Sequence, residues 1–575
     1  MNGAPARLSL LAIAGITFVV FIPSLSNNFV DWDDNLNFIT NPYYRGLGWT
    51  QLRWMLRATV TGHWIPATWL TLGLDYRLWG MNPAGYHLTN VVLHALNAVV
   101  FTLIAFRLLR LARPRCATTT LGAGSVAAAL FFALHPLRAE TVAWVTERRG
   151  LLSAFFVLLT VLTYIRMCAA ESAARRRWLV ASVGAYALAL LSKAAVVPLP
   201  ILLLVLDAYP LGRLTSQWRR WTAPATRGVW LEKLPYAVLA GIAAATALLV
   251  THARGSAQPI ESYPPSARWA MLSYGLMFYL EKTVVPLALN PLYELPERIN
   301  ALDLPFLASI VGAAVVTGAL WLLRRRWPAG LALWTSYALI LIPVSGLFQA
   351  GHQLVADRYT YLSCLPWALL LGAAVCSMLD AAASGRVRKS LAAVAAGILV
   401  VWIVSLAYLT WLQVQVWQNT ETLWRYALEL DPACALCHNQ LGAELGNRGE
   451  VAPAAFHFEQ ALALRPNDAG LNGNLGLALL KARRAPEAIT YLDRALQREP
   501  ANTEVRVHLG VALMTIGRAD EGIDQLRQAT LRSPGHARAR YELARAYLAL
   551  GDRAAAAVQA EALRRLDPRL AAQLK

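Results

Sequence analysis

Three aspartates near the N-terminus are the first residues of this sequence that could carry out chemistry. Asp31, Asp33 and Asp34 directly follow an apolar run, and aromatic and apolar residues flank them. Carboxylates this close raise one another's pKa, so one can accept a proton from a hydroxyl group while another stays ionised. Asp33 and Asp34 could also hold a divalent cation such as Mg²⁺ or Mn²⁺. The alternative is a solvated acidic turn, and we favour the chemical interpretation because little polar loop surrounds the cluster.

A second group of charged residues lies further along the chain. His135 and Glu140 are close together, and Glu147, Arg148 and Arg149 follow them. Arginine and histidine side chains in this segment could bind a phosphate. Glu140 could share a cation or position a sugar hydroxyl. The alternative is that these charges only set the topology of the chain.

Other polar residues lie in or beside apolar segments. His87, Asn90 and His94 are three and seven positions apart, so they share one face of a predicted helix. They could bind a substrate, or they could bond to neighbouring helices. Further candidates for binding a substrate or its phosphate are His63, Lys193, Lys282, Asp357 and Arg358. The last two could instead form a local ion pair.

The composition indicates that membrane-spanning helices position these residues. Of the 575 residues 57% are hydrophobic and 15% are charged, and the mean hydropathy is +0.41, which excludes an ordinary soluble globule. The net charge of +19 comes from basic clusters between apolar runs, so we expect no nucleic-acid partner. A spanning helix needs about 20 apolar residues. We predict eleven spans, at residues 8–25, 87–107, 121–134, 150–166, 178–194, 196–209, 234–251, 304–323, 329–348, 361–379 and 391–412.

The basic clusters set the predicted orientation of these spans. All five clusters follow an even-numbered span, so they and the N-terminus face the cytoplasm, while the C-terminus lies outside. Residues 269–289 carry Glu281 and Lys282 in their middle, and we predict an interfacial or re-entrant helix there because charges at mid-membrane are costly. The segments that hold the polar candidates then face outward: 26–86, 135–149, 252–303 and 349–360.

A 34-residue repeat fills the C-terminal part of the chain. Prolines recur at this interval from Pro432 to Pro568, and a Leu-Gly or Leu-Ala pair recurs in the same phase four times. This period is typical of the tetratricopeptide repeat (TPR), whose helical pairs stack into a solenoid with a concave binding surface. We predict an all-α chain with a membrane domain over 1–412 and an extracytoplasmic TPR domain over 413–575. The latter has about four full repeats and a leading helix over Thr420–Leu430.

A pair of cysteines stands at the start of the repeats. Cys434, Cys437 and His438 match the attachment pattern of c-type haem. A packed TPR helix leaves no cavity for a macrocycle, so we expect no haem there. The two cysteines either pack as small apolar residues or form a disulfide. The remaining cysteines are scattered and predict no zinc site.

In combination, these motifs resemble the transmembrane-and-TPR O-mannosyltransferases, which belong to the GT-C glycosyltransferases. The resemblance runs in order along nearly the whole chain. The motifs are Phe29-Val30-x-x-Asp33-Asp34, Trp64-Ile65-Pro66, Gly85-Tyr86-His87-Leu88-Thr89-Asn90-x-x-x-His94, His135-Pro136-x-x-x-Glu140-x-Val142 with Arg148 and Leu151-Leu152-Ser153, and Ala356-Asp357-Arg358-Tyr359-x-Tyr361.

The resemblance implies an enzyme that moves a sugar, mannose in the eukaryotic members, from a polyprenyl phosphate to a protein hydroxyl on the non-cytoplasmic face. It implies a bacterial inner membrane, or the lumenal side of the ER membrane for a eukaryotic chain. The acidic pair of the family maps onto Asp33 and Asp34, with Glu140 as a third catalytic candidate. The TPR domain is expected to bind the acceptor protein.

The mechanism that we expect is one displacement at the anomeric carbon, which inverts it. Asp33, or Asp34 as second choice, takes the proton of the acceptor, and basic groups stabilise the departing lipid phosphate. These groups are Arg148 and His135, with Lys282 or Arg358. A membrane scaffold without catalysis is the main alternative. A secondary transporter would need ionisable residues near the bilayer midplane, whereas here they gather at the outer ends of the spans.

Overall fold

The chain folds almost entirely into helices, which form two separate units. The computed structural model describes residues 4–214, 218–253, 263–348 and 351–574. Unit 1 comprises Met1–Leu423 and unit 2 comprises Trp424–Lys575. This division falls within the helix Thr420–Leu430, and the helix that was predicted to end at residue 412 continues to Val416. The all-α prediction is confirmed.

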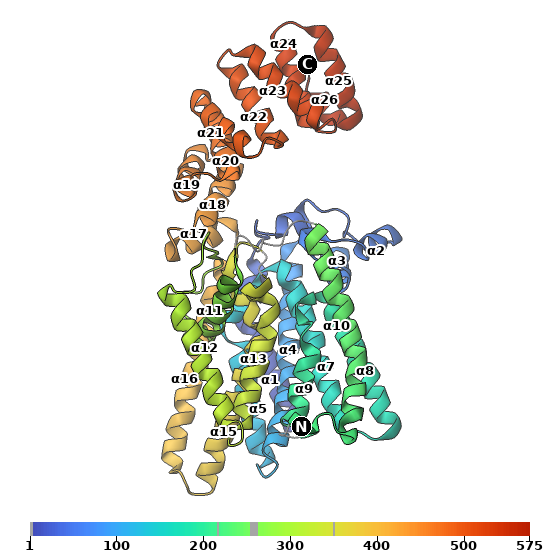
Figure 1. The fold of residues 1–575 in the computed structure, drawn as a ribbon, viewed down its shortest axis with the longest axis vertical. Coiled ribbons are helices and arrows are strands. Elements are labelled where there is room, and N and C mark those ends of the chain that lie inside the picture. The colour runs from blue at the N-terminus through green and yellow to red at the C-terminus, as the bar shows by residue number, and fades with distance from the viewer. Residues whose placement is uncertain (1–3, 215–217, 254–262, 349–350, 575) are drawn as a thin grey trace. The chain divides into compact units, whose positions relative to one another are not determined.

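Unit 1 is a bundle of helices that run side by side (Figure 1). Helix α4 packs against α1, α5 and α7, while α7 also packs against α8, and α5 against α15. The bounds are α1 Ala4–Val20, α2 Trp49–Met55, α3 Pro66–Trp79, α4 Pro83–Ala112, α5 Thr118–Ala133, α6 Ala139–Ala143, α7 Arg148–Cys168, α8 Ser172–Ser192, α9 Leu199–Ala208, α10 Arg227–Ala253, α11 Pro265–Val284, α12 Leu304–Leu323, α13 Pro328–Leu341, α14 Thr360–Ser363, α15 Leu365–Ala383 and α16 Lys389–Val416.

Fewer helices than predicted are long and apolar enough to cross a membrane. Among the described residues seven qualify, in α4, α7, α10, α12, α13, α15 and α16. An eighth is reached if α5 is joined to residues 136–143, from which it is bent by 58°. The predicted count of eleven is not confirmed on these criteria. Helices α1 and α9 have only 17 and 10 residues, and α8 begins with three arginines, Arg175–Arg177.

Helix α11 corresponds to the segment that the sequence analysis set apart from the spans. The helix contacts a short antiparallel strand pair, β1 (Tyr293–Glu294) and β2 (Gln353–Val355). Near its start, Met271 packs with Leu295 and Leu354. Near its end, the hydroxyl of Tyr279 accepts a hydrogen bond of 2.9 Å from the amide of Ala356. Helix α11 also packs against α12 and is not among the seven helices above, while its interfacial or re-entrant placement stays a prediction.

Helices α5 and α15 approach each other backbone to backbone. A Cβ atom on Gly124 would lie 2.6 Å from the carbonyl oxygen of Gly372. A Cβ atom on Gly372 would lie 2.5 Å from the carbonyl oxygen of Gly124. Only glycine fits on both sides, which is the usual way for helices without a hydrophobic driving force between them to pack closely.

Unit 2 confirms the predicted repeat. Four helical pairs follow the leading helix α17 (Thr420–Leu430), whose bounds match the prediction. In three pairs the repeated glycine meets the partner helix: a Cβ atom would lie 3.0 Å from Phe458 at Gly442, and 2.6 Å from a leucine at Gly476 and at Gly510. The bounds are α18 Ala435–Asn447, α19 Val451–Leu464, α20 Ala469–Lys481, α21 Ala485–Arg498, α22 Thr503–Thr515, α23 Ala519–Arg532, α24 Ala537–Ala549, α25 Arg553–Leu566 and α26 Pro568–Ala571.

The cysteine pair at the start of the repeats is a disulfide. Cys434 caps the N-terminus of α18 and is bonded to Cys437 within the first turn. The sequence left open whether the two cysteines pack as small apolar residues or form a disulfide, and the structure shows the disulfide. Both sulfur atoms are therefore engaged with each other, while the absence of haem stays a prediction.

The glycine contact between α5 and α15 predicts that Gly124→Leu destabilises unit 1. The new side chain meets backbone atoms that cannot move aside, and overpacking of this kind costs about 1–3 kcal/mol. The thermal midpoint of the purified protein in detergent measures the loss. Gly122→Leu on the same helix is the control, because no atom lies within 4 Å of a Cβ at that position. Equal midpoints for the two variants would contradict the close approach.

Candidate active site

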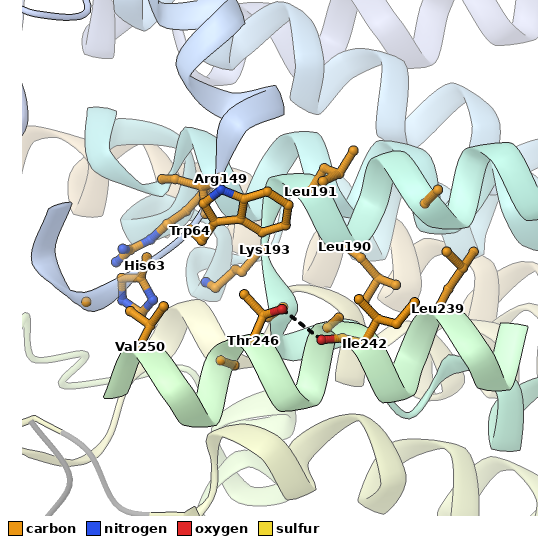
Figure 2. A pocket seen from close by; sticks show the side chains of 16 residues that line it. His63, Trp64, Arg149, Leu190, Leu191, Lys193, Leu239, Ile242, Thr246 and Val250 are labelled. Carbon is orange, nitrogen blue, oxygen red and sulfur yellow. Dashed lines mark hydrogen bonds between the residues drawn. The ribbon is translucent and has the colours of Figure 1, made fainter. Parts of the chain in front are cut away.

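A cavity of about 190 Å³ lies between α8 and α10 at the end of unit 1 that carries the predicted polar loops (Figure 2). One end of the cavity is polar and is lined by His63, Arg149 and Lys193. Its walls are almost wholly apolar, and come from Ala187, Leu190, Leu191, Leu239, Ile242, Ala243, Ala247 and Val250. The cavity can therefore hold a long apolar group whose charged end reaches the two cations.

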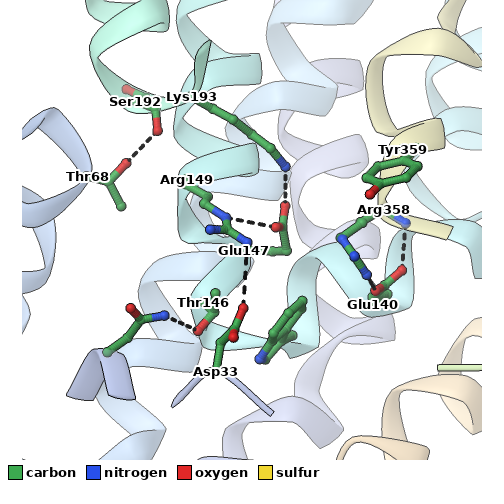
Figure 3. A network of polar contacts seen from close by, with 12 residues as sticks. Asp33, Thr68, Glu140, Thr146, Glu147, Arg149, Ser192, Lys193, Arg358 and Tyr359 are labelled. Atoms are coloured by element: carbon green, nitrogen blue, oxygen red, sulfur yellow. Dashed lines mark hydrogen bonds and ion pairs between the residues drawn. The ribbon is translucent and has the colours of Figure 1, made fainter. Parts of the chain in front are cut away.

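The two cations of the cavity are held by one carboxylate (Figure 3). Glu147 accepts a hydrogen bond of 3.0 Å from Arg149 Nε on Oε1, and one of 2.7 Å from Lys193 Nζ on Oε2. The Glu147 side chain is only 1% exposed. Glu147 precedes the first residue of α7, and Lys193 follows the last residue of α8. The start of one helix and the end of its neighbour are thus joined by a buried charged group with a net charge of +1.

Asp33 is the acidic residue that faces this cluster. Its Oδ2 lies 3.9 Å from the guanidinium of Arg149, and its side chain is 30% exposed. Burial raises the pKa of the Asp33 carboxyl, while the positive charges of Arg149 and Arg358 partly oppose the rise. A carboxylate with a raised pKa and an accessible oxygen is a stronger base than an ordinary aspartate. The predicted role of Asp33 is therefore compatible with its place in the structure.

The carboxyl group of Asp34, in contrast, accepts hydrogen bonds within the protein on both of its oxygen atoms. Its Oδ1 accepts hydrogen bonds from the amide (3.2 Å) and the hydroxyl (2.6 Å) of Thr146, and its Oδ2 accepts one from the amide of Val30 (3.1 Å). Burial nevertheless raises the pKa of Asp34 to about 7. The side chain is fully enclosed, so it ties the first loop to the residues before α7. Asp34 as the second choice of base stays a prediction.

The expected divalent cation does not fit the acidic residues in place. Both oxygen atoms of Asp34 already accept hydrogen bonds, and Asp33 is the other acidic residue of the predicted site. No group of three or more His, Cys, Asp or Glu side chains able to hold a metal ion occurs in the part of the chain that the structure describes. We therefore route no chemical step through a metal.

Glu140 and Arg358 form a second ion pair close to the first cluster. Glu140 Oε2 accepts a hydrogen bond of 2.6 Å from the amide of Arg358, and its Oε1 pairs with the guanidinium. The guanidinium also lies over the rings of Trp144 and Tyr359, at 5.5 and 5.0 Å from their centroids. Because its charge acts on Asp33, Arg358 belongs to the same electrostatic site. Glu140 holds Arg358 in place rather than facing the cavity.

Arg148 was predicted to bind the donor phosphate, and the structure places its side chain inside the bundle and not in the lining of the cavity. The side chain is fully buried and donates to Asp75 Oδ2 (2.7 Å), to the carbonyl of Tyr86 (2.8 Å) and to Asn90. Successive residues on a helix point about 100° apart. Arg148 therefore points into the bundle, while Arg149 points to the cavity. The sequence named Glu147 and Arg149 in this charged segment but chose Arg148 as the phosphate-binding residue, although a pair of arginines on an outward loop runs against the usual charge rule.

The three predicted histidines of the bundle are also buried in structural positions. His94 bonds to the hydroxyl of Tyr361 (2.7 Å) and to the carbonyl of Ala133 (3.0 Å). His135 bonds through Nε2 to the carbonyl of Thr283 at 3.1 Å. His87 is 1% exposed and lies on the buried face of α4. None of these rings lines the cavity.

The remaining predicted residues divide between the cavity and its surroundings. His63 faces the cavity, and desolvation together with the positive charges of Arg149 and Lys193 lowers its pKa to about 3, so it is neutral. Asp357 is buried and accepts a hydrogen bond of 3.2 Å from the hydroxyl of Tyr293. Lys282 donates to a backbone carbonyl (3.0 Å) and lies over the ring of Phe278, outside the cavity.

Comparisons with known proteins relate both parts of the chain to described families. Residues 439–503, 508–571 and 479–532 match models of the tetratricopeptide repeat. The protein O-mannosyl-transferase TMTC3 of Mus musculus is 27% identical over 437 residues, which cover 70% of this chain and 45% of the relative. TMTC4 of Homo sapiens is 25% identical over 508 residues, or 78% of this chain and 65% of the relative.

Relatives that match over a shorter stretch have a higher sequence identity there. TMTC2 of Mus musculus is 34% identical over 115 residues, which are 20% of this chain and 12% of the relative. The chain spans less than two thirds of the length of these relatives. Among solved structures, YrrB, described as a TPR protein with an unusual peptide-binding site, is 29% identical and covers 26% of this chain and 78% of its own, with a TM-score of 0.24. The chain is thus similar, at low identity, to O-mannosyl-transferases with TPR repeats.

Because Asp33 and Asp34 have different surroundings, we expect their substitution to lower the stability by different amounts. Asp34→Ala leaves buried donors of Val30 and Thr146 without an acceptor, which costs about 1–3 kcal/mol for each. Asp33→Ala removes a partly exposed carboxylate that accepts no hydrogen bond from Thr146 or Val30, so its effect stays within about 0.5 kcal/mol. Thermal unfolding of the two purified variants distinguishes them. A loss of similar size in both would show that Asp34 is not the anchor.

Proposed function

We propose that unit 1 transfers a sugar, mannose, from a polyprenyl phosphate to a hydroxyl group of a protein. One observation carries this proposal: the Asp33 carboxylate lies 3.9 Å from Arg149, and Arg149 also lines the polar end of an apolar cavity. A base, a phosphate-binding cation and an apolar channel are thereby adjacent. The similarity to O-mannosyl-transferases supports the same activity.

The cavity suits a lipid phosphate better than a soluble sugar nucleotide. Its apolar walls match a polyprenyl chain, and its polar end offers Arg149 and Lys193. Only 11% of the apolar stretch of α10 is buried inside the protein, so little protein covers the outer side of the cavity. A lipid could therefore reach the cavity from the bilayer. Arginine and lysine both bind phosphate oxygens through charge-assisted hydrogen bonds.

Glu147 fixes the positions of Arg149 and Lys193 before the donor phosphate binds. Each of its oxygens holds one cation, so neither side chain needs to be ordered when the donor arrives. Groups that are already oriented stabilise developing charge without reorganisation, which is the main electrostatic contribution of many enzymes. The net charge of +1 of this group is complementary to a phosphate.

The transfer then needs a single displacement. Asp33 accepts the proton of the acceptor hydroxyl, and the hydroxyl oxygen forms a bond to the anomeric carbon. The bond from that carbon to the phosphate oxygen breaks, and the lipid phosphate leaves with the electron pair, next to Arg149 and Lys193. One displacement inverts the anomeric centre. Positioning and charge stabilisation supply most of the rate, because a phosphate is already a good leaving group.

We place this chemistry on the non-cytoplasmic face of a bacterial inner membrane. The basic clusters of the sequence support the orientation, since they gather in the loops at the opposite ends of the predicted spans. On the same basis unit 2 lies outside, where its repeats would bind the acceptor protein. A scaffold without catalysis would leave the buried group of Glu147, Arg149 and Lys193 without a purpose.

Replacing the proposed base tests the activity directly. Asp33→Asn keeps the size of the side chain but removes its basicity, so kcat should fall by about 10²–10⁴-fold while donor binding persists. The assay measures transfer of labelled mannose from polyprenyl-phosphate mannose to an acceptor protein from the same cells. In the unaltered protein, activity should fall as the pH drops through the pKa of Asp33, which lies above the ordinary value of 3.8. Full activity in well-folded Asp33→Asn protein would leave only the scaffold.

Lys193 lines the cavity and Lys282 does not, although the sequence named both as candidates for binding the donor phosphate. Lys193→Met removes a charge-assisted hydrogen bond to the donor phosphate, so the KM for the donor should rise about 10-fold or more. Lys282→Met is the matched control, because Lys282 lies outside the cavity. Its KM should stay within about twofold of the unaltered protein. An equal rise in both variants would show that the phosphate binds elsewhere.

A further inference from the structure

Residues 35–81 expose an unusual set of apolar side chains at the end of unit 1 that carries the cavity. We call this segment, which includes α2 and α3, the lip. Figure 1 shows α2 projecting sideways from this end of unit 1. Trp49 is 78% exposed and Tyr43 is 62% exposed. The other exposed apolar residues of the loop are Leu36, Ile39, Leu47 and Leu56, and those of α3 are Leu70, Leu74, Leu78 and Trp79.

The charge of the lip is one-sided. Its sequence holds four arginines, Arg45, Arg53, Arg57 and Arg77, and a single acidic residue, Asp75. Asp75 is buried and paired with Arg148 at 2.7 Å, so the lip presents no acidic side chain. Arg53, Arg57 and Arg77 are exposed. The exposed aromatic and aliphatic side chains of the lip are therefore accompanied by basic side chains and by no acidic one.

This exposed surface is built on a firm core and is not a loose loop. Phe38, Tyr44, Met55 and Trp69 pack together in one buried cluster. Helix α3 packs against α4 and α8, and the hydroxyl of Thr68 donates a hydrogen bond of 3.1 Å to a backbone carbonyl at the end of α8. The lip is thereby fixed to helices of the membrane bundle. Its apolar side chains point outward because the inward positions are already filled.

We infer that the lip lies in the headgroup region of the bilayer that unit 1 spans and binds anionic phospholipids there. Exposed apolar patches of this size mark interaction sites. Tryptophan and tyrosine are enriched at the membrane interface, and arginines beside them attract anionic headgroups. The spanning helices bring the membrane to this surface, so the occupant is the bilayer itself. Because His63, Trp64 and Ile65 of the lip line the cavity, this contact also sets the mouth of the cavity at the bilayer surface.

The inference does not depend on the transfer reaction and is tested without it. An environment-sensitive fluorophore is attached at Thr50→Cys in α2, in full-length protein that carries Cys116→Ser and Cys168→Ser. The protein is placed in nanodiscs of phosphatidylcholine with increasing phosphatidylglycerol and a small amount of nitroxide-labelled lipid. We expect lipid-dependent quenching that strengthens with phosphatidylglycerol. Arg53→Gln with Arg57→Gln should move the midpoint of this titration to a higher phosphatidylglycerol content, since each arginine near the surface contributes about a fivefold gain in binding.

A matched variant separates the lip from general charge effects. Arg325→Gln with Arg326→Gln removes two exposed arginines just after α12 and should leave the midpoint at Thr50→Cys unchanged. Thermal unfolding verifies that both double variants are folded. An unchanged midpoint in the lip variant, or emission as in water that the labelled lipid does not quench, would overturn the inference. In that case the lip faces solvent or a protein partner.

Discussion

The candidate site depends on one buried carboxylate, Glu147. Removing a carboxylate from water costs several kcal/mol, and only closely paired cations offset this cost. Arg149 and Lys193 do so on separate oxygens of Glu147. The same two bonds join the start of α7 to the end of α8, so they define the polar end of the cavity. Without Glu147, two cations would repel each other at the point where the helices meet.

Single steps along the chain separate chemical from structural roles in this site. Asp33 faces Arg149, while Asp34 turns inward to the amides of Val30 and Thr146. Arg149 reaches the cavity, while its neighbour Arg148 is fully buried. In both cases the fully enclosed residue fixes the backbone that presents its neighbour, which is Asp33 in the loop and Arg149 in α7. In the loop, Asp34 is the anchor and Asp33 the proposed reactive group. In the first turn of α7, Arg148 is the anchor and Arg149 the proposed reactive group.

The sequence was most informative where a pattern repeats or where residue type is restricted. The 34-residue period predicted the repeats and the bounds of α17, because each helical pair must bury the same face. The sequence also named the polar clusters around Asp33 and Glu140, and Lys193 as a single further candidate. The sequence ranked Asp33 before Asp34 but named Arg148 rather than Arg149 as a phosphate-binding group, since the direction of a side chain depends on the local backbone. The count of eleven spans stays a prediction, because an apolar run such as 196–209 forms an α-helix of only ten residues.

The proposed mechanism links donor binding to the strength of the base. Burial raises the pKa of Asp33, and the charge of Arg149 opposes the rise. A donor phosphate at Arg149 brings negative charge close to Asp33 and so weakens that opposition. A like charge nearby disfavours the ionised form of a carboxylate, which raises its pKa further. Asp33 would then be the strongest base when the sugar donor is in place, and a weaker one in the empty site. Departure of the lipid phosphate returns the cation's charge to Asp33 and favours release of the proton after each transfer.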